Sequence, residues 1–390
     1  MGELESLLLV LALIYLSECL VWVRRGALAL GTWWGKSFRI LYPGALLGNQ
    51  RGGLLLANPL PPLGTLFLSP LVPFSLSPQG ALAYSSACLN PAGRPAQTAR
   101  YFRFAEIREV ARDGRKVRVN GRIFLRAIST FSARHWVDAL RRLRKLGEAE
   151  RAKAIKGWIH ESLDAGEISR RLKECRSRAR PLRLLSNALF AYLFLFVVPL
   201  VWRFGLGPYG LWLLAGMLAQ TITIALLFRR AHQTLHSEAD EERLKPFLTM
   251  LLAPPTAIRA PDLLARHLLE RFHPLAIAKV LCSPENFESF ARQVLLDLRH
   301  PLFPVCPTND PDALAAEHWF RAAQEEAITK FLLRVDLKPD DLVAPPKPAE
   351  PANQSYCPRC RAQFVLREGH CADCGGRPLE PFGNVEGLKR

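Results

Sequence analysis

Two long runs without a charged side chain, at residues 184–202 and 211–228, constrain the fold of this chain more than any other feature. They are 19 and 18 residues long, and the residues RFGLGPYG separate them. A helix of about 20 apolar residues crosses the hydrocarbon of a bilayer, and glycine and proline favour a tight turn. The sequence therefore predicts a transmembrane hairpin over residues 184–228.

A third apolar run, LLLVLALIYLSECLVWV, occupies residues 7–23 and is followed by Arg24 and Arg25. Acidic residues precede it, whereas a secretory signal peptide carries basic residues there, so we predict an uncleaved anchor over residues 1–25. Glu18 is costly inside a span unless it faces protein or lies near the interface. A buried or interfacial helix is therefore the alternative for this segment.

The chain is strongly basic, with a formal charge of +17, and the charge gathers next to the apolar runs. Residues 170–183 hold seven Lys or Arg and one acidic residue, Glu174, directly before the first arm of the hairpin. The segment lacks the interleaved aromatics and the recognition motifs of a nucleic-acid binder. We therefore predict anionic lipid headgroups as its partner and disfavour nucleic acid.

The distribution of Lys and Arg also predicts how the spans are oriented, because basic residues accumulate in loops that stay in the cytoplasm. The two arginines after the first run, residues 170–183, and the pair Arg229 and Arg230 should all lie on that side. We expect a multi-pass protein of the cell membrane. Its N-terminus and the turn at 203–210 would lie outside, and its soluble domains and C-terminus in the cytoplasm.

Residues 26–146 are rich in glycine, proline and serine between short apolar runs, which predicts a β-rich domain. Two dipeptides in it, Asp113-Gly114 and Asn120-Gly121, are strong signals of β-hairpin turns. Alternating apolar residues flank these turns, as expected for strands with one buried face.

An amphipathic helix is predicted at the end of this domain, with Ser132 as its cap and Trp136, Leu140 and Leu143 on one face. Hairpins closed by one such helix resemble the pleckstrin-homology-like superfold over residues 50–146. The resemblance implies a small barrel used for protein or lipid contact. An unrelated α+β domain is the alternative.

The other segments around the hairpin are predicted to be helices and a linker. Residues 147–183 form a basic helical segment, and residues 229–342 form a helical domain with apolar residues three to four apart. The Ser-Pro at 283–284 and the Asp-Pro at 310–311 indicate helix starts. The Pro-rich sequence VAPPKPAEPANQ, residues 343–354, predicts an extended linker.

Residues 355–382 contain four of the nine cysteines, arranged in two CxxC pairs. Ten residues separate Cys357 and Cys360 from Cys371 and Cys374. Four thiolates at this spacing suit the tetrahedral coordination of Zn²⁺. The other five cysteines stand singly, which argues against a disulfide framework.

This tail resembles the short zinc-ribbon family in the two knuckles CPRC and CADCGG. The resemblance implies a small module that folds around a structural zinc ion. A thioredoxin-like redox pair would need a βαβ context, and a rubredoxin-like iron site would use the same four sulfurs. Because four cysteines close the coordination sphere, we predict a structural site in which His370 is not a ligand.

A weaker candidate site contains two histidines. His232 and His236 have the i, i+4 spacing of metal ligands on a helix, with Glu238 and Asp240 beyond them. No HExxH motif accompanies them, so we favour histidines at the membrane interface.

A second weak candidate pairs Cys282 and Cys306 with His273 and His300 as nucleophile and base. No family signature surrounds these residues, so buried thiols and ordinary cap or linker histidines are favoured. The motifs GxGxxG, GxxxxGK[ST] and GxSxG are absent from the sequence. We predict no catalytic residue and no organic cofactor.

These features together predict an α+β multi-pass membrane protein with three transmembrane helices, two cytoplasmic domains and a C-terminal zinc ribbon. The favoured function is a non-enzymatic scaffold or adaptor whose ribbon contacts a protein partner. One alternative is an oligomeric membrane enzyme or transport component acting on a lipid or hydrophobic solute, with Glu18 as the group to test. The third is a membrane-bound nucleic-acid binder.

Overall fold

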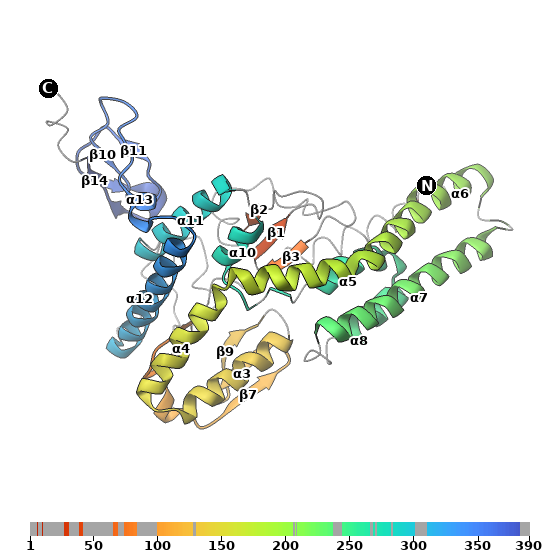
Figure 1. The fold of residues 1–390 in the computed structure, drawn as a ribbon, viewed down its shortest axis with the longest axis horizontal. Coiled ribbons are helices and arrows are strands. Elements are labelled where there is room, and N and C mark those ends of the chain that lie inside the picture. The colour runs from red at the N-terminus through yellow and green to blue at the C-terminus, as the bar shows by residue number, and fades with distance from the viewer. Residues whose placement is uncertain are drawn as a thin grey trace. The chain divides into compact units, whose positions relative to one another are not determined.

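A computed structural model describes this chain as two compact units (Figure 1). The first unit comprises Met1–Val72, Ile107–Lys145 and Asp164–Ser283, and the second comprises Pro73–Glu106, Leu146–Leu163 and Pro284–Arg390. The residues that the structure describes are Ser6, Val10, 27–30, 39–41, 65–68, 74–83, 100–127, 130–205, 207, 209–236, 244–265, 268–269, 271–281, 284–300 and 310–382.

A pair of long helices forms the centre of the first unit. The segments α5 (Ala165–Ala191), η3 (Tyr192–Val197, a π-helical stretch) and α6 (Val198–Phe204) make one continuous helix of 40 residues. The helix α7 (Gly210–Leu235), 26 residues long, packs on α5 and on η3. By length and composition, both helices are able to cross a membrane.

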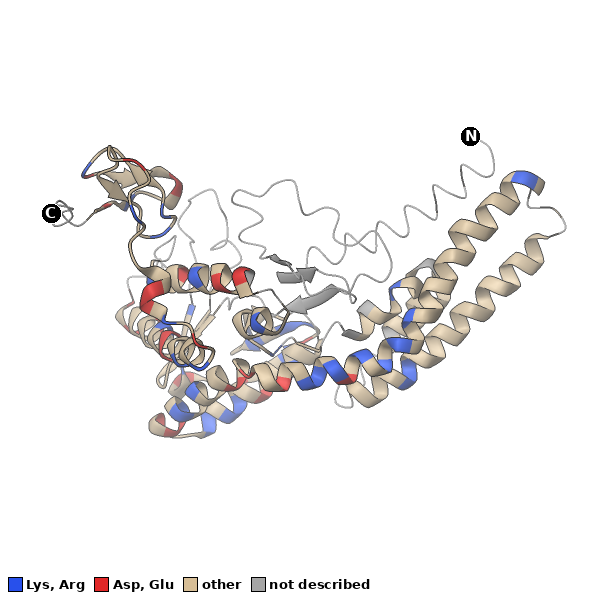
Figure 2. Cartoon of the chain, turned by 45° about the horizontal axis from the view of Figure 1, so that its top comes forward, with Lys and Arg blue, Asp and Glu red and all other residues tan. Residues whose placement is uncertain are grey.

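Charge is distributed unevenly along this hairpin. Figure 2 shows basic residues gathered along α5 where the hairpin begins, whereas the two arms beyond them are uncharged as far as the turn. The predicted arms at 184–202 and 211–228 both lie within these helices. Of the third predicted span, 7–23, only Val10 lies within the described residues, so that span stays a prediction.

The two arms contact each other closely near the middle of the hairpin. The Tyr192 hydroxyl donates to the Leu213 carbonyl at 2.9 Å. A Cβ atom at Gly216 would lie 2.6 Å from the same hydroxyl, so glycine is needed for the ring to fit. Nearer the basic end, Leu189 and Phe228 belong to one buried apolar cluster.

Four short helical segments of the first unit follow the hairpin along the chain: α8 (Leu244–Leu252), η5 (Pro254–Arg259), α9 (Ala260–Ala265) and α10 (Pro274–Leu281). They pack on α5 or α7. The Ser186 hydroxyl donates to the Ala257 carbonyl at 3.2 Å. The beginning of the arm at 184–202 is therefore covered by protein. The predicted helical domain, 229–342, contributes residues to both units.

The described strands of the first unit form two antiparallel sheets. One has the order β2-β1-β3, made of Arg39–Leu41, Ala27–Leu30 and Thr65–Leu68. The other has the order β7-β8-β9, made of Val110–Asp113, Lys116–Val119 and Arg122–Arg126.

Both predicted hairpins are present in the second of these sheets, with the first turn at Gly114-Arg115, one residue after the predicted position, and the second at Asn120-Gly121. Gly114 has φ 58°, and Asn120 and Gly121 have φ 48° and 74°, the left-handed conformations that tight turns require. The helix α3 (Thr130–Lys145) packs on β7 and β8. It begins before Ser132, so the prediction that Ser132 is its N-terminal cap is wrong.

The second unit contains the antiparallel sheet β4-β5-β6, made of Phe74–Leu76, Gly80–Ala83 and Arg100–Arg103. The helix α12 (Pro311–Arg334) packs on β4 and β5, and Arg103 donates to Asp312 on it at 2.9 Å. The helix α4 (Glu148–Ser162) packs on α12 as well. The strands predicted within 50–146 thus belong to both units, and the pleckstrin-homology-like arrangement stays a prediction.

The remaining helices of the second unit lead to the cysteine-rich tail. The helix α11 (Pro284–Arg299) begins at the predicted Ser-Pro, and α12 begins after Asp310, whose carboxylate accepts from the Asp312 amide at 3.0 Å. Both predicted helix starts are confirmed. A short helix, α13 (Pro339–Val343), packs on α11 and precedes the Pro-rich segment.

Candidate metal centre

Short strands frame the four cysteines. The strands β10 (Ser355–Tyr356), β11 (Gln363–Phe364) and β14 (Glu380–Pro381) pair in the order β11-β10-β14. A second ladder joins β12 (His370–Cys371) and β13 (Arg377–Pro378). Such a small module buries little apolar surface, so its stability requires an additional cross-link.

Each CxxC pair lies in a tight backbone turn. In the first knuckle the Arg361 amide donates to the Cys357 carbonyl at 2.9 Å, and in the second the Gly376 amide donates to the Cys371 carbonyl at 3.0 Å. The residue after each pair has a left-handed conformation, with φ 63° at Arg361 and 66° at Gly375. Both knuckles therefore place a left-handed residue directly after the second cysteine, which is arginine in the first knuckle and glycine in the second.

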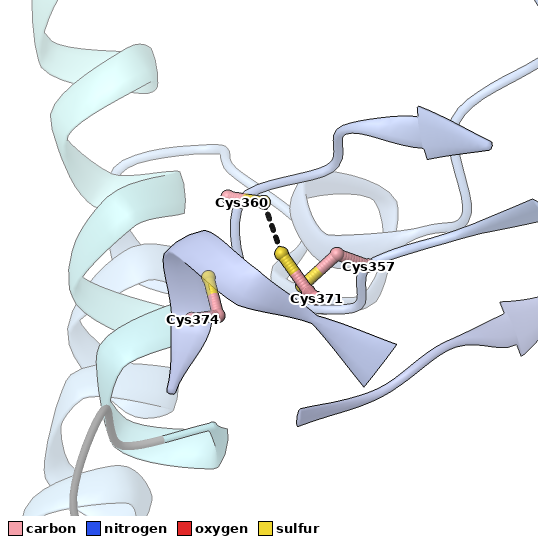
Figure 3. A group of neighbouring side chains, drawn as sticks. All are labelled: Cys357, Cys360, Cys371 and Cys374. Atoms are coloured by element: carbon pink, nitrogen blue, oxygen red, sulfur yellow. Dashed lines mark hydrogen bonds between the residues drawn. The ribbon is translucent and has the colours of Figure 1, made fainter. Parts of the chain in front are cut away.

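The four sulfur atoms converge on one point, as Figure 3 shows. All four lie within 4.8 Å of one another, and the Cys360 and Cys371 sulfurs are 3.6 Å apart. Zinc–sulfur bonds of about 2.3 Å at tetrahedral angles place the sulfurs about 3.8 Å apart. The sulfur–sulfur distances in the cluster are thus close to those that tetrahedral coordination of a zinc ion requires. The cluster consists of Cys357, Cys360, Cys371 and Cys374.

Whether these four thiols suit a metal ion also depends on their protonation, because a metal binds the thiolate form. Burial raises the pKa of Cys360 and of Cys374. Burial alone would raise the pKa of Cys357, but the pKa is lowered because hydrogen bonds from the backbone amides of Cys360 and Arg359, together with those of the Cys360 and Cys371 side chains, outweigh burial. Four thiolates this close repel one another unless a cation lies between them. The donor set fits a soft divalent ion such as Zn²⁺, which deprotonates coordinating thiols.

Three arginines next to the cysteines attach this module to helices of the same unit. Arg359, between the first two cysteines, donates to the Asp297 carboxylate on α11 at 2.5 Å. Arg361 donates to the Leu342 carbonyl in α13 at 3.1 Å. Arg377, in β13, contacts His300 at 3.2 Å.

The Pro-rich segment is also attached to the ribbon. The Gln363 side chain donates to the Lys347 carbonyl at 2.8 Å and accepts from the Ala349 amide at 2.7 Å. Asn353 donates to the same side-chain oxygen at 2.8 Å. Residues 344–354, which include a turn at 351–352, are therefore held against the ribbon and do not form a free linker.

The structure assigns local roles to the weaker candidates where it describes them. The His232 and His236 rings lie 4.8 Å apart, and the His236 Nε2 atom is 2.9 Å from the Leu264 carbonyl. Glu238 and Asp240 lie outside the described residues, and among those described the only group with metal-binding geometry is the four cysteines.

The proposed nucleophile–base pair gains no support. The His273 Nδ1 atom accepts from the Leu275 amide at 3.1 Å, which makes this histidine a cap of α10. His300 contacts Arg377, and His370 is exposed in β12. Cys282 and Cys306 lie outside the described residues.

No protein-family model matches this chain, and no curated protein or solved structure is significantly similar to it. The functional conclusion therefore rests on the metal centre, on its attachment to the helices and on the two apolar helices.

Proposed function

We propose that this protein is a membrane-anchored scaffold or adaptor whose zinc-loaded ribbon braces a cytoplasmic unit and presents it to a protein partner. The observation that carries the proposal is the closed four-cysteine cluster, whose flanking arginines contact α11 and α13. A closed site of this kind holds a fold and leaves no coordination position for a substrate.

The membrane part of the proposal rests on the two helices that are long and apolar enough to cross a bilayer. The basic residues at 170–183 lie at the start of the first of these helices, where anionic headgroups would meet them. By the charge rule the second unit and the C-terminus lie in the cytoplasm. A third span at residues 7–23 belongs to this proposal.

The bracing role follows from how the ribbon is attached. An arginine inside a knuckle points in a direction that depends on the turn around the metal. When the ion is lost, the turn loosens and the arginines lose their fixed positions. Metal binding and the shape of the second unit are therefore coupled.

The test uses the intact chain in its native membrane and a Cys360→Ser, Cys374→Ser double variant. His370→Ala is the matched control, since His370 is exposed and adjacent to Cys371 but lies outside the cluster. Alkaline carbonate extraction reports integration in the membrane, elemental analysis of the purified protein reports zinc, and crosslinking in cells with mass spectrometry reports neighbours.

We expect the intact chain and the His370→Ala variant to resist extraction, to hold about one zinc ion per chain and to crosslink to a defined protein. The double variant should stay in the membrane and lose both the zinc and the partner. An unchanged set of neighbours in the zinc-free variant contradicts the adaptor role, and release by carbonate contradicts the membrane anchor.

A further inference from the structure

The helix α8 carries a row of exposed leucines. Leu244, Leu248 and Leu252 are spaced four residues apart and so lie on one face of the helix. Their exposed fractions are 62%, 44% and 85%. Large apolar side chains gathered on one face, with no described segment covering them, indicate a surface that contacts something apolar.

The other side of α8 is packed against the hairpin. Met250 is fully buried, in the cluster that also contains Leu189 of α5 and Phe228 of α7. Phe247 and Leu251 pack against the same cluster. The helix is therefore held in place by protein on one side, and its exposed face has a fixed direction.

The apolar cluster that contains Met250 lies at the level where the charged part of the hairpin ends and the uncharged arms begin. Arg229 directly follows Phe228 in the sequence, and Arg183 precedes Leu189 by six residues, about 9 Å along a helix. If the arms cross a bilayer, this level corresponds to the boundary between headgroups and acyl chains.

We propose that α8 is an interfacial membrane helix whose leucine row, Leu244, Leu248 and Leu252, inserts among lipid acyl chains beside the hairpin. This inference rests on the proposed membrane anchoring and adds a lipid-contacting element to it. An exposed apolar helix face beside the boundary between headgroups and acyl chains can contact lipid, as the apolar faces of interfacial helices do.

Lipid suits this face because α7, on which α8 packs, exposes a similar row. Leu214, Leu218, Ile222 and Leu226 are spaced four apart and are 47%, 39%, 48% and 50% exposed. If the arms cross a bilayer, this row of α7 contacts lipid, and α8 packs on the same helix. A protein partner would have to bind within the headgroup layer, directly beside that surface.

The experiment introduces the photoreactive residue benzoylphenylalanine into the full chain, one position at a time, at residues 244, 248 and 252. The purified protein is reconstituted into vesicles of phosphatidylcholine and phosphatidylglycerol that contain tritiated phosphatidylcholine. Residues 218 and 222 of α7 are the positive controls. Residue 333 of α12 is the matched negative control, because Leu333 is 54% exposed and belongs to the second unit.

We expect crosslinked lipid at the three α8 positions to reach the level found at 218 and 222 and to exceed that at 333 several-fold. Labelling at 218 and 222 without labelling at 244, 248 and 252 overturns the α8 inference and leaves the membrane anchor intact. Absence of labelling at 218 and 222 overturns the anchor itself. Crosslinks from α8 to a second chain or another protein in place of lipid also overturn the inference.

Discussion

The guanidinium of Arg359 donates to the carboxylate of Asp297 at 2.5 Å, although the two residues are 62 positions apart in the sequence. Arg359 lies inside the first knuckle, and its side chain is only 14% exposed, against 39% for Asp297. This ion pair ties the turn that carries Cys357 and Cys360 to helix α11. A change at Asp297 therefore tests the attachment of the ribbon without touching a metal ligand.

We expect Asp297→Ala to loosen the ribbon while its zinc content stays unchanged. A hydrogen bond to a charged group contributes about 1.5–3 kcal/mol, and partial exposure of Asp297 places the expected loss near the lower end. Hydrogen–deuterium exchange of peptides covering 355–382 and 284–299 would measure it. Elemental analysis of the same sample would report the zinc.

The matched control is Asp340→Ala. Asp340 also pairs with an arginine, Arg299 at 3.4 Å, but its side chain is 92% exposed. Such a surface pair contributes between zero and about 1 kcal/mol, so exchange should stay as in the unchanged protein. Equal effects of the two substitutions would contradict a specific role for the Arg359–Asp297 pair.

The parts of this molecule that could be predicted from sequence are those encoded locally. The helical hairpin is encoded in two uncharged runs. The four-cysteine cluster is encoded in two CxxC pairs that lie within 18 consecutive residues, 357–374. The two β-hairpin turns are encoded by Gly114 and by Asn120-Gly121, which have left-handed backbone conformations that few other residues adopt.

The attachment of the ribbon could not be predicted, because its partners are far away in sequence. Arg359 contacts Asp297, which is 62 residues away in the sequence, and Arg377 contacts His300, which is 77 residues away. The identity of a single arginine does not indicate which of the many possible partners it will contact. Similarly, α8 has nine residues and α10 eight, too few turns for a periodic apolar pattern to stand out.

The second prediction concerns Arg361, which has a strained backbone conformation and a side chain that forms hydrogen bonds to the segment before the ribbon. Its φ is 63°, and its guanidinium donates to the carbonyls of Leu342 and Ala344. Arg361→Gly should relieve the backbone strain and lose the hydrogen bonds, whereas Arg361→Ala should lose the bonds and keep the strain. We expect the alanine variant to be less stable than the glycine variant by about 1–2 kcal/mol.

A competition assay with a zinc chelator would measure this difference, because zinc affinity includes the free energy of folding the knuckle. Gly376→Ala should also weaken zinc binding, since Gly376 has φ 79°. If Arg361→Ala and Arg361→Gly lose zinc at the same chelator concentration, backbone strain at Arg361 does not contribute.

The contact between Tyr192 and Gly216 gives a third prediction, on the hairpin. In Gly216→Ala the new methyl group would lie 2.6 Å from the Tyr192 hydroxyl, so the ring must move and its bond to Leu213 breaks. In Tyr192→Phe the hydroxyl is absent, which costs about 0.6 kcal/mol for a hydrogen bond in a membrane protein. Removal of the hydroxyl also removes the closest contact of the new methyl group and leaves the ring Cζ atom 3.1 Å away.

We therefore expect the double variant Tyr192→Phe, Gly216→Ala to be more stable than the sum of the single effects predicts. Reversible unfolding in mixed detergent micelles, followed by circular dichroism, would measure the four free energies. Gly210→Ala is the control, since no atom lies within 4 Å of a Cβ there. Additive effects would mean that the two residues do not share one contact.

The last prediction concerns pH and His273. Burial lowers the pKa of His273 to about 4, and its Nδ1 atom accepts a hydrogen bond only in the neutral form. In the unfolded chain the pKa of His273 is near its ordinary value of about 6.5. Between about pH 4 and pH 6.5 the histidine is therefore protonated in the unfolded chain and neutral in the folded chain. The stability from this group is therefore complete above about pH 6.5 and is lost as the pH falls towards 4.

The loss would be at most about 3 kcal/mol, and less because His273 is only half-buried. In His273→Asn the side-chain oxygen still accepts from the Leu275 amide but does not titrate. Hydrogen exchange of peptides covering α10, corrected for the intrinsic effect of pH, should increase between pH 7 and pH 5 in the unchanged protein and much less in His273→Asn. Parallel pH dependence in both proteins would show that another group controls the stability of this helix.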